Sequence, residues 1–404
     1  MEQLTLVSLF AGAGGLDAGL ERAGFETRLA IDNDVDAVAT LKATQAARVP
    51  IERSDRHYLE GATIARADLT KLTKGDLKTL WGSDKAPSLL AGGPPCQSFS
   101  SAGKQQGIAD ARGLLFRDFV RTARALKPAF VLFENVQGLV TARDSDGQIG
   151  GVLRLVQDEF ESAGYACSFA LANAADYGAP QKRVRLVMLG TRRHRLPSMP
   201  PAATHTKNPL DVGSLLMPWV PIKDALAGLP ESEGDAVWAS SQMQEKLAEV
   251  QAGSGIRVGG QVMNNRPSGQ WGYRQDGFIA AWDQPSRTIR AASTPDWLKM
   301  DDGTHRRLTW QECARLQGFP DGWAFSGSLT SRFRQIGNAV PFELAHALGR
   351  EARASLAEGS LKRGERPTST PWPANFRRRI RYTTAEHRVN GTLRRRAKRV
   401  EQLV

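Results

Sequence analysis

The chain of 404 residues has little cysteine and histidine, with three and six residues of these types. Cys96, Cys167 and Cys313 lie far apart and form no CxxC pair. Neither a disulfide framework nor a zinc site is supported, so we expect no metal and a reducing, cytoplasmic location. No apolar run approaches the roughly 20 residues that cross a bilayer, and MEQLTLVSLF lacks the basic start of a secretory signal. We therefore expect no membrane association.

Positive charge is abundant and unevenly distributed. The net charge is 54 − 42 = +12, and residues 362–404 carry 13 Lys/Arg against three Glu, or +10. Such basic runs are either a solvated, partly disordered surface or a site that binds phosphates by releasing counterions. Charge by itself does not choose between DNA, RNA and an acidic membrane surface.

Short apolar runs alternate with helical patterns over the first 190 residues. Near-continuous apolar strands are typical of a parallel sheet with both faces covered. The alternation predicts a doubly wound α/β sheet that binds ligands at the carboxyl ends of its strands. The predicted strands are Leu4–Phe10, Arg28–Asp32, Ile64–Asp68, Ser88–Gly92, Phe130–Glu134, Tyr165–Leu171 and Leu186–Thr191, and the predicted helices between them include Val35–Gln45, Leu114–Leu126 and Gly151–Ala163.

The pattern changes after Thr191. Many prolines and glycines and little periodicity follow, which indicates a second, irregular domain. Helical patterns return at Thr309–Leu316 and after Pro341. We therefore predict a catalytic domain from 1–190 plus 329–355, a second domain with a hinge at 191–328, and a basic C-terminal tail at 356–404.

The stretch LFAGAGG (Leu9–Gly15) follows the first predicted strand and opens a helix. Glycines there allow a tight turn and bring backbone N–H groups near a ligand such as a dinucleotide, a phosphate or S-adenosylmethionine. Asp32 and Asp68 end the next two predicted strands, where they can accept hydrogen bonds from ribose hydroxyls and from an adenine amino group. Taken singly, each carboxylate is better interpreted as a solvated or helix-capping residue. In series with the glycine loop they favour an adenosyl ligand.

Cys96 lies in the turn GGPPCQSFS (Gly92–Ser100), directly after a predicted strand. Pro94 and Pro95 restrict the backbone and hold the thiol in one direction. An isolated cysteine is more often an inert core residue, but this turn is polar. We therefore interpret Cys96 as a nucleophile, for which a nearby cation would lower the thiol pKa. The glycine-containing segment 103–113 that follows is typical of a mobile lid.

Glu134 in FENV ends the next predicted strand, and Arg183 and Arg185 in QKRVR precede the last one. Desolvation at a strand end raises a carboxyl pKa and favours the protonated form. Taken singly, each of these three residues is also typical of an ordinary surface position. Because Cys96 and Glu134 follow what should be neighbouring strands, we expect one shared pocket, into which the two arginines point.

In order along the chain, LFAGAGG, PPCQSFS, ENV, QKRVR, RRLTWQECARLQGFPD (Arg306–Asp321) and RQIGNAVP (Arg334–Pro341) resemble the motifs of the prokaryotic DNA cytosine-5 methyltransferases. The family usually has an acidic residue where this chain has Ser8, and Glu followed by a bulky apolar residue where it has Asp32–Asn33. The resemblance implies a Rossmann-like methyltransferase sheet with a smaller target-recognition domain between QKRVR and RRLT.

The resemblance also implies residue roles. Cys96 is the nucleophile, Glu134 contacts the target cytosine, and Asn135, Arg183 and Arg185 support the site. S-adenosylmethionine, which becomes S-adenosylhomocysteine, is the implied cofactor. Its pocket is formed by residues from five segments: Phe10, Ala11, Gly12, Gly14, Gly15, Leu16, Asp32, Asn33, Asp68, Leu69, Pro94, Asn338, Ala339 and Val340.

The expected partner is double-stranded DNA in the nucleoid, bound by a monomer, with a cognate restriction endonuclease only as a genetic partner. Three alternatives remain at this stage. The substrate is RNA, as in the tRNA-methylating branch; the chain is a non-catalytic DNA-binding module; or the glycine loop is a nicotinamide site of a dehydrogenase. The dehydrogenase alternative leaves the PPC, ENV and IGNAVP motifs unexplained. The non-catalytic alternative is disfavoured because Cys96, Glu134 and Arg185 are all intact.

Overall fold

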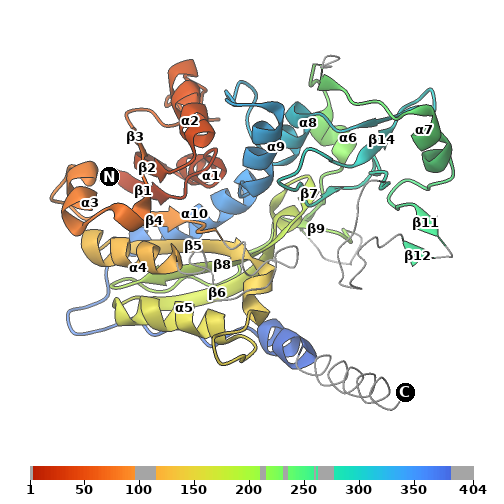
Figure 1. Cartoon of the computed structure of the whole chain (residues 1–404). Helices are drawn as coiled ribbons and strands as arrows, with labels where there is room; N and C mark the ends of the chain where they lie inside the picture. The colour runs from red at the N-terminus through yellow and green to blue at the C-terminus, as the bar shows by residue number, and fades with distance from the viewer. Residues whose placement is uncertain are drawn as a thin grey trace, which may run out of the picture.

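The computed structural model describes residues 3–95, 115–209, 215–230, 235–258, 261–262 and 277–383. A seven-stranded sheet with the order β3-β2-β1-β4-β5-β8-β6 forms its centre (Figure 1). The strands match the predicted runs to within three residues at each end. They are β1 (Leu4–Leu9), β2 (Phe25–Asp32), β3 (Thr63–Arg66), β4 (Leu89–Gly92), β5 (Phe130–Val136), β6 (Ala166–Asn173) and β8 (Val184–Thr191).

The sheet is mixed rather than parallel throughout, which corrects one expectation. β3, β2, β1, β4 and β5 pair in parallel, whereas β8 pairs antiparallel with both β5 and β6. Only η5 (Ala174–Tyr177) and β7 (Gln181–Lys182) separate β6 from β8. A connection this short reverses the chain between adjacent strands, because a parallel pair needs a crossover of a dozen or more residues.

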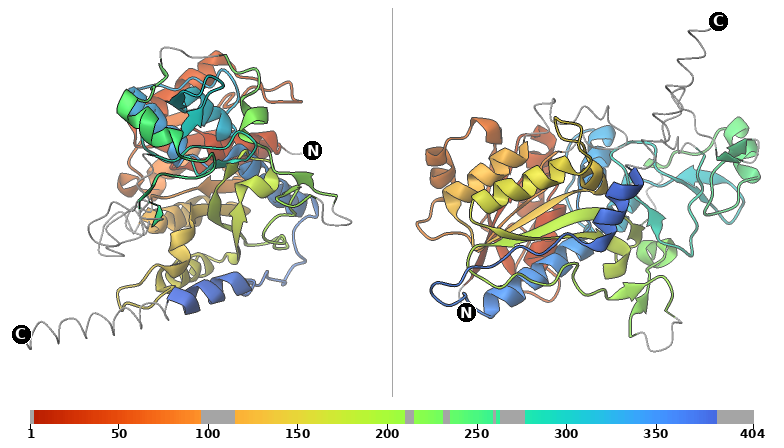
Figure 2. Two further views of the ribbon diagram at one scale, coloured as in Figure 1. Left: turned by 90° about the vertical axis from the view of Figure 1, so that its right-hand side faces the viewer. Right: turned by 90° about the horizontal axis from the view of Figure 1, so that it is seen from below.

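Helices cover both faces of the sheet, as Figure 2 shows from below. Alternate residues of one strand enter different cores: Val131 and Phe133 pack under the helices of one face, and Phe130 and Leu132 under those of the other. The first face carries α3 (Lys74–Trp81), α4 (Leu115–Leu126) and α5 (Gly151–Ser162), and the second carries α1 (Gly15–Arg22) and α10 (Phe342–Ala357). Of these, α3 had not been predicted.

The second region lies beside the carboxyl ends of the parallel strands (Figure 1), and its described residues form short ladders. These are β9 (His205–Thr206) with β10 (Met217–Pro218), β11 (Arg257–Val258) with β12 (Gln261–Val262), β14 (Trp297–Lys299) with β15 (His305–Arg307), and β13 (Ser286–Arg287), which pairs with β7. Its helices are α6 (Ile222–Leu226) and α7 (Ser241–Ala248).

A third buried cluster joins this region to the sheet domain. It contains α8 (Trp310–Leu316), α9 (Leu329–Asn338) and the aromatic rings that follow α8. Phe319 lies 5.0 Å from Phe342 of α10 between ring centroids, and Trp323 lies 5.4 Å from Tyr58. Phe319 and Trp323, which follow α8, therefore pack against residues of the sheet domain. Within the described ranges, no helix is long and apolar enough to cross a membrane.

Candidate active site

Glu134 and Arg185 form a buried ion pair between β5 and β8. The antiparallel register pairs Arg185 with Val136. The Arg185 side chain therefore extends along β5 to contact Glu134, which lies two residues before Val136 on the same face of the sheet. Arg185 Nε lies 3.0 Å from Glu134 Oε1, with 14% and 11% of the two side chains exposed. Burial raises the pKa of Glu134, while the guanidinium groups of Arg185 and Arg183 oppose that rise. The carboxyl group is thus held in one orientation and can exist in its protonated form.

The segment that leads to Cys96 lies against this carboxyl group. β4 ends at Gly92, and a Cβ added to Gly93 would be 2.7 Å from Glu134 Oε2. Asn135 Nδ2 donates to the Pro94 carbonyl oxygen at 3.2 Å in a buried contact. Only glycine at position 93 allows this approach. Two residues of the ENV motif therefore hold the start of the cysteine turn, whereas Cys96 itself and the predicted lid at 103–113 lie outside the described residues.

Arg183 has a different environment from Arg185. It is 2% exposed, and its Nη atoms donate to the carbonyl oxygens of Ile289 at 2.6 Å and Gly337 at 2.7 Å. Burial is the main influence on its pKa, which falls well below the ordinary arginine value. Arg183 therefore ties the sheet to the second region and to α9, rather than presenting its Nη atoms to an anion.

The glycine loop turns sharply between β1 and α1. Phe10, Gly12 and Gly14 have positive φ angles of 53°, 55° and 86°. Gly12 N–H donates to Asp32 Oδ2 and Asp34 N–H to Asp32 Oδ1, both at 2.8 Å. Burial raises the pKa of Asp32, although these N–H groups oppose that rise. The end of β2 is thus fixed beside the loop, and each Asp32 oxygen keeps a lone pair for a hydroxyl group.

The first and last motifs meet at Gly15. A Cβ on Gly15 would lie 2.7 Å from the Val340 carbonyl oxygen and 2.9 Å from Ala339 Cβ. Trp323 Nε1 donates to the Ala13 carbonyl oxygen at 2.9 Å. Segments more than 300 residues apart therefore form one wall.

The remaining predicted cofactor residues divide into exposed and buried positions. Asn33 and Asn338 are exposed, and Asp68 is partly exposed and accepts from Thr70 N–H at 3.1 Å and Thr70 Oγ1 at 2.7 Å. These hydrogen bonds lower the Asp68 pKa and cap η1 (Leu69–Lys71), so the capping interpretation of this carboxylate holds at least in part. Ala11, Leu16, Leu69, Pro94, Ala339 and Val340 are buried.

A buried pair of glutamines, to which we had assigned no role, connects three motifs. Gln181 Nε2 donates to Gln317 Oε1 at 2.5 Å, and Gln317 Nε2 donates to the Ile336 and Ala339 carbonyl oxygens at 2.6 and 3.0 Å. Gln181 Oε1 also accepts from Ile289 N–H at 2.9 Å. Both residues stand in quoted motifs, but nothing in their spacing shows that they meet.

Ser8, the departure from the family pattern, is also buried and partnered. Its Oγ donates to Asp17 Oδ1 of α1 in a short hydrogen bond, and both residues are 0% exposed. Burial raises the pKa of Asp17 to about 7. A carboxyl group is thus present at this end of β1 after all, supplied by the helix.

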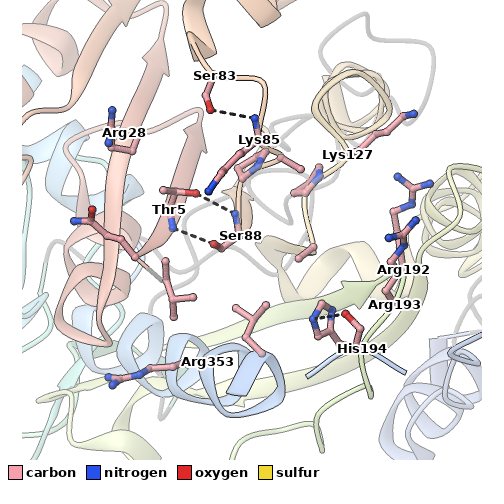
Figure 3. Close-up of a pocket in the computed structure, with 18 of the residues that line it drawn as sticks. Thr5, Arg28, Ser83, Lys85, Ser88, Lys127, Arg192, Arg193, His194 and Arg353 are labelled. Atoms are coloured by element: carbon pink, nitrogen blue, oxygen red, sulfur yellow. Dashed lines mark hydrogen bonds between the residues drawn. The ribbon is translucent and has the colours of Figure 1, made fainter. Parts of the chain in front are cut away.

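A cavity of about 1050 Å³ lies at the opposite end of the sheet, where β1 and β4 begin (Figure 3). Thr5 and Ser88 hydrogen-bond each other there, and none of the predicted site residues lines it. Basic side chains surround it: Arg28, Lys85, Lys127, Arg192, Arg193 and Arg353. It is separate from the arrangement around Glu134.

The other two cysteines are buried, and burial raises the pKa of both thiols. They are therefore packing residues. In the part of the chain that the structure describes, no group of three His, Cys, Asp or Glu residues could hold a metal ion.

Comparisons with known proteins identify the family of this chain. Residues 4–354 match the sequence model of the family described as C-5 cytosine-specific DNA methylase. Type II methyltransferase M.PspPI of Psychrobacter sp. is 35% identical, over 86% of this chain and 78% of its own length. M.NaeI of Lentzea aerocolonigenes is 34% identical, over 88% of this chain and 76% of its own length.

Solved structures support the fold. A prophage-encoded DNA modification methyltransferase of E. coli superposes with a TM-score of 0.61 at 22% identity, over 88% of this chain and 99% of that one. S. pombe Dnmt2 gives a TM-score of 0.57 at 18% identity, over 88% and 99%. The chain belongs to the C-5 cytosine-specific DNA methylase family and is a DNA cytosine-5 methyltransferase with the Rossmann-like fold.

Proposed function

We propose that this enzyme methylates C5 of a cytosine rotated out of a specific double-stranded DNA sequence, as the modification member of a restriction–modification pair. The curated relatives in the comparison, named as type II methyltransferases, support that setting. The contacts that join Glu134 to Arg185 and Gly93, and Asn135 to Pro94, are the observation on which the catalytic part rests.

The residues around the glycine loop fit S-adenosylmethionine. A Cβ at Gly12 would meet no atom of the residues that the structure describes within 4 Å, so these residues leave this face of the loop open. Asp32 is positioned to accept from ribose hydroxyls, and the buried Leu16, Ala339 and Val340 provide an apolar wall. The bound cofactor supplies a methyl group made electrophilic by its sulfonium sulfur. We assign Phe10, Asn33, Asp68, Leu69 and Asn338 to the same pocket.

Cys96 is the proposed nucleophile. C5 of cytosine is a poor nucleophile, and addition of a thiolate to C6 gives the ring enamine character at C5. After methyl transfer, loss of the C5 proton expels the thiolate and restores the ring. Asn135 is a positioning residue, because its hydrogen bond to Pro94 fixes the turn that carries the thiol. C6 is inaccessible in a stacked duplex, so the base must leave the helix at a cost of a few kcal/mol.

Glu134 holds the target ring through N3. Electron density grows on the ring as the thiolate adds, and a protonated carboxyl group donating to N3 stabilises it. Burial favours that protonated form, and Arg185 fixes the other carboxyl oxygen. We assign sequence recognition to side chains of residues 191–328 that reach base edges.

Bisulfite sequencing of DNA from cells that express the protein tests this function directly. We expect methylated cytosines in one short motif, and none with Cys96→Ser, which should still bind DNA and cofactor. Substantial methylation by Cys96→Ser would remove the nucleophile assignment. Side-by-side labelling of duplex DNA and tRNA with radiolabelled cofactor separates the DNA function from the tRNA alternative.

A further inference from the structure

The chain continues past the family match, which ends at residue 354, and the next 29 residues are described. Residues 361–373 run along the outer edge of the sheet, as Figure 2 shows in blue. Thr370 N–H donates to the Cys167 carbonyl oxygen at 3.0 Å, and Cys167 N–H donates to Ser369 Oγ at 2.9 Å. Leu361 N–H also donates to the Arg193 carbonyl oxygen at 2.6 Å. This segment therefore partly covers the edge strand β6, which a sheet otherwise leaves unpaired.

The tail helix (residues 374–383) that follows is anchored to the protein. Phe376 is 0% exposed and belongs to the core under α4 and α5. One turn later, Ile380 packs on Gly150, where an added Cβ would lie 2.9 Å from Ile380 Cδ1. Just before the helix, Trp372 Nε1 donates to Gln157 Oε1 at 2.6 Å. Phe376 and Ile380, four residues apart, thus hold one face of the tail helix against the protein.

The rest of the tail helix is basic and exposed. Arg377, Arg378, Arg379 and Arg381 are all exposed to solvent. None of them forms an ion pair with a carboxylate in the described part of the chain. Four guanidinium groups within five residues repel one another, so a fixed helix that carries them is suited to a polyanion.

The tail helix lies at the end of the sheet that carries the active site. β5, which contains Glu134, leads directly into η4 (Gln137–Thr141), and the loop after η4 ends at Gly150. Ile380 contacts that same Gly150. Figure 1 shows the tail helix in blue at the start of α5, on the side toward the second region. Its arginines are therefore placed at the same end of the sheet as Glu134, where the proposed function requires the DNA to bind.

We propose that the tail helix binds the phosphate backbone of duplex DNA that flanks the recognised sequence. The inference rests on the proposed function. Each phosphate neutralised releases counterions, and the slope of log K against log salt is about −0.9 per contact. Four arginines then contribute up to roughly 3 to 4 units of slope without adding sequence specificity.

The test compares a duplex of about 40 base pairs with one of about 14, both containing the methylated site. We would measure affinity against salt for the full chain with Arg377, Arg378, Arg379 and Arg381 all changed to Gln. We expect the magnitude of the slope to fall by about 3 on the long duplex, with little change on the short one and unchanged turnover at saturating DNA. The corresponding Lys variant should keep the wild-type slope.

A matched control removes four exposed cations near the opposite edge of the sheet: Lys42, Arg53, Lys74 and Lys78, all changed to Gln. It should leave the slope on the long duplex unchanged. An equal loss in this control, or no loss in the tail variant, overturns the inference. So does a tail variant that loses binding only to vesicles containing phosphatidylserine or only to tRNA. If the wild-type protein methylates no DNA, the proposed function itself fails, whatever the slopes.

Discussion

Arg185 Nε and Glu134 Oε1 lie 3.0 Å apart at the boundary between β5 and β8, where both side chains are largely withdrawn from water. Because the strands are antiparallel, this contact joins a glutamate near the end of one strand to an arginine near the start of the other. Burial and the guanidinium act in opposite directions on the carboxyl group. Their balance determines the pH at which Glu134 releases its proton.

Glu134→Gln should slow the single-turnover methylation rate by about 10²-fold or more, because an amide is a much weaker proton donor at N3 than a carboxyl group. Rapid-quench measurement with saturating DNA and cofactor gives this rate directly. An unchanged rate would count against the role of Glu134.

Arg185→Gln should shift the alkaline limb of the pH–rate profile to higher pH. In the proposed mechanism the protonated form of Glu134 is the active one, so activity is lost as pH rises through its pKa, and removing the neighbouring positive charge raises that pKa. The pH dependence of the single-turnover rate measures the shift. Arg53→Gln, at a side chain 91% exposed, serves as control and should keep the wild-type profile. A shift to lower pH would contradict the assigned charge balance.

Gly15→Ala should weaken cofactor binding by about tenfold or more, because the new methyl group would displace the Ala339–Val340 wall. Calorimetric titration with S-adenosylhomocysteine measures the affinity. Gly75→Ala in α3, where the nearest atom would be 3.6 Å away, is the matched control and should bind normally. Normal cofactor binding by Gly15→Ala would show that the contact of Gly15 with Ala339 and Val340 does not shape the cofactor pocket.

Asp17 should make stability depend on pH. The pKa of Asp17 rises from 3.8 to about 7 on folding. Its contribution to the free energy of unfolding is therefore fully present below pH 3.8 and is lost as pH rises toward 7. At about 1.4 kcal/mol per pKa unit, the loss amounts to roughly 4 kcal/mol. Urea unfolding of wild type and Asp17→Asn from pH 5 to 8 should show the variant gaining relative stability as pH rises. A constant difference would mean that Asp17 does not titrate in this range.

Phe376→Ala should lower the free energy of unfolding by about 3 kcal/mol, since a fully buried ring is removed from a core. Arg378→Ala, at an exposed position of the same helix, should change it little. Denaturant titration of both variants distinguishes a helix that packs on the core from one that makes no stabilising contacts with it. Equal stability of the two variants would show that the helix is not anchored by Phe376.

Local pattern was sufficient for most of the elements. Leu89–Gly92 and Phe130–Val136 are short apolar runs bounded by turn residues, which identify strands without knowledge of their neighbours. The helix α3 was missed because its apolar face is small, with only Leu77 buried. The direction of β8 was missed because strand patterns do not encode which way a strand runs.

The sequence predicted which residues belong to the candidate site, but not which of them contact one another. Glu134 and Arg185 were identified from their motifs, yet the different environment of Arg183 appears only when Ile289 and Gly337 are seen to accept its hydrogen bonds. The Gln181–Gln317 pair and the Ser8–Asp17 pair likewise depend on distant segments that meet in the core.

The sequence by itself determined the family, the order of the strands along the chain and the chemical groups available for catalysis, because motifs and hydrophobic periodicity are local properties. Tertiary structure alone decided that Gly93 lies against Glu134, that Gly15 lies against Val340, and that Phe376 holds the basic helix at the carboxyl end of the sheet. Each of these contacts joins residues far apart in the chain, and only the packing of buried surfaces brings such residues together.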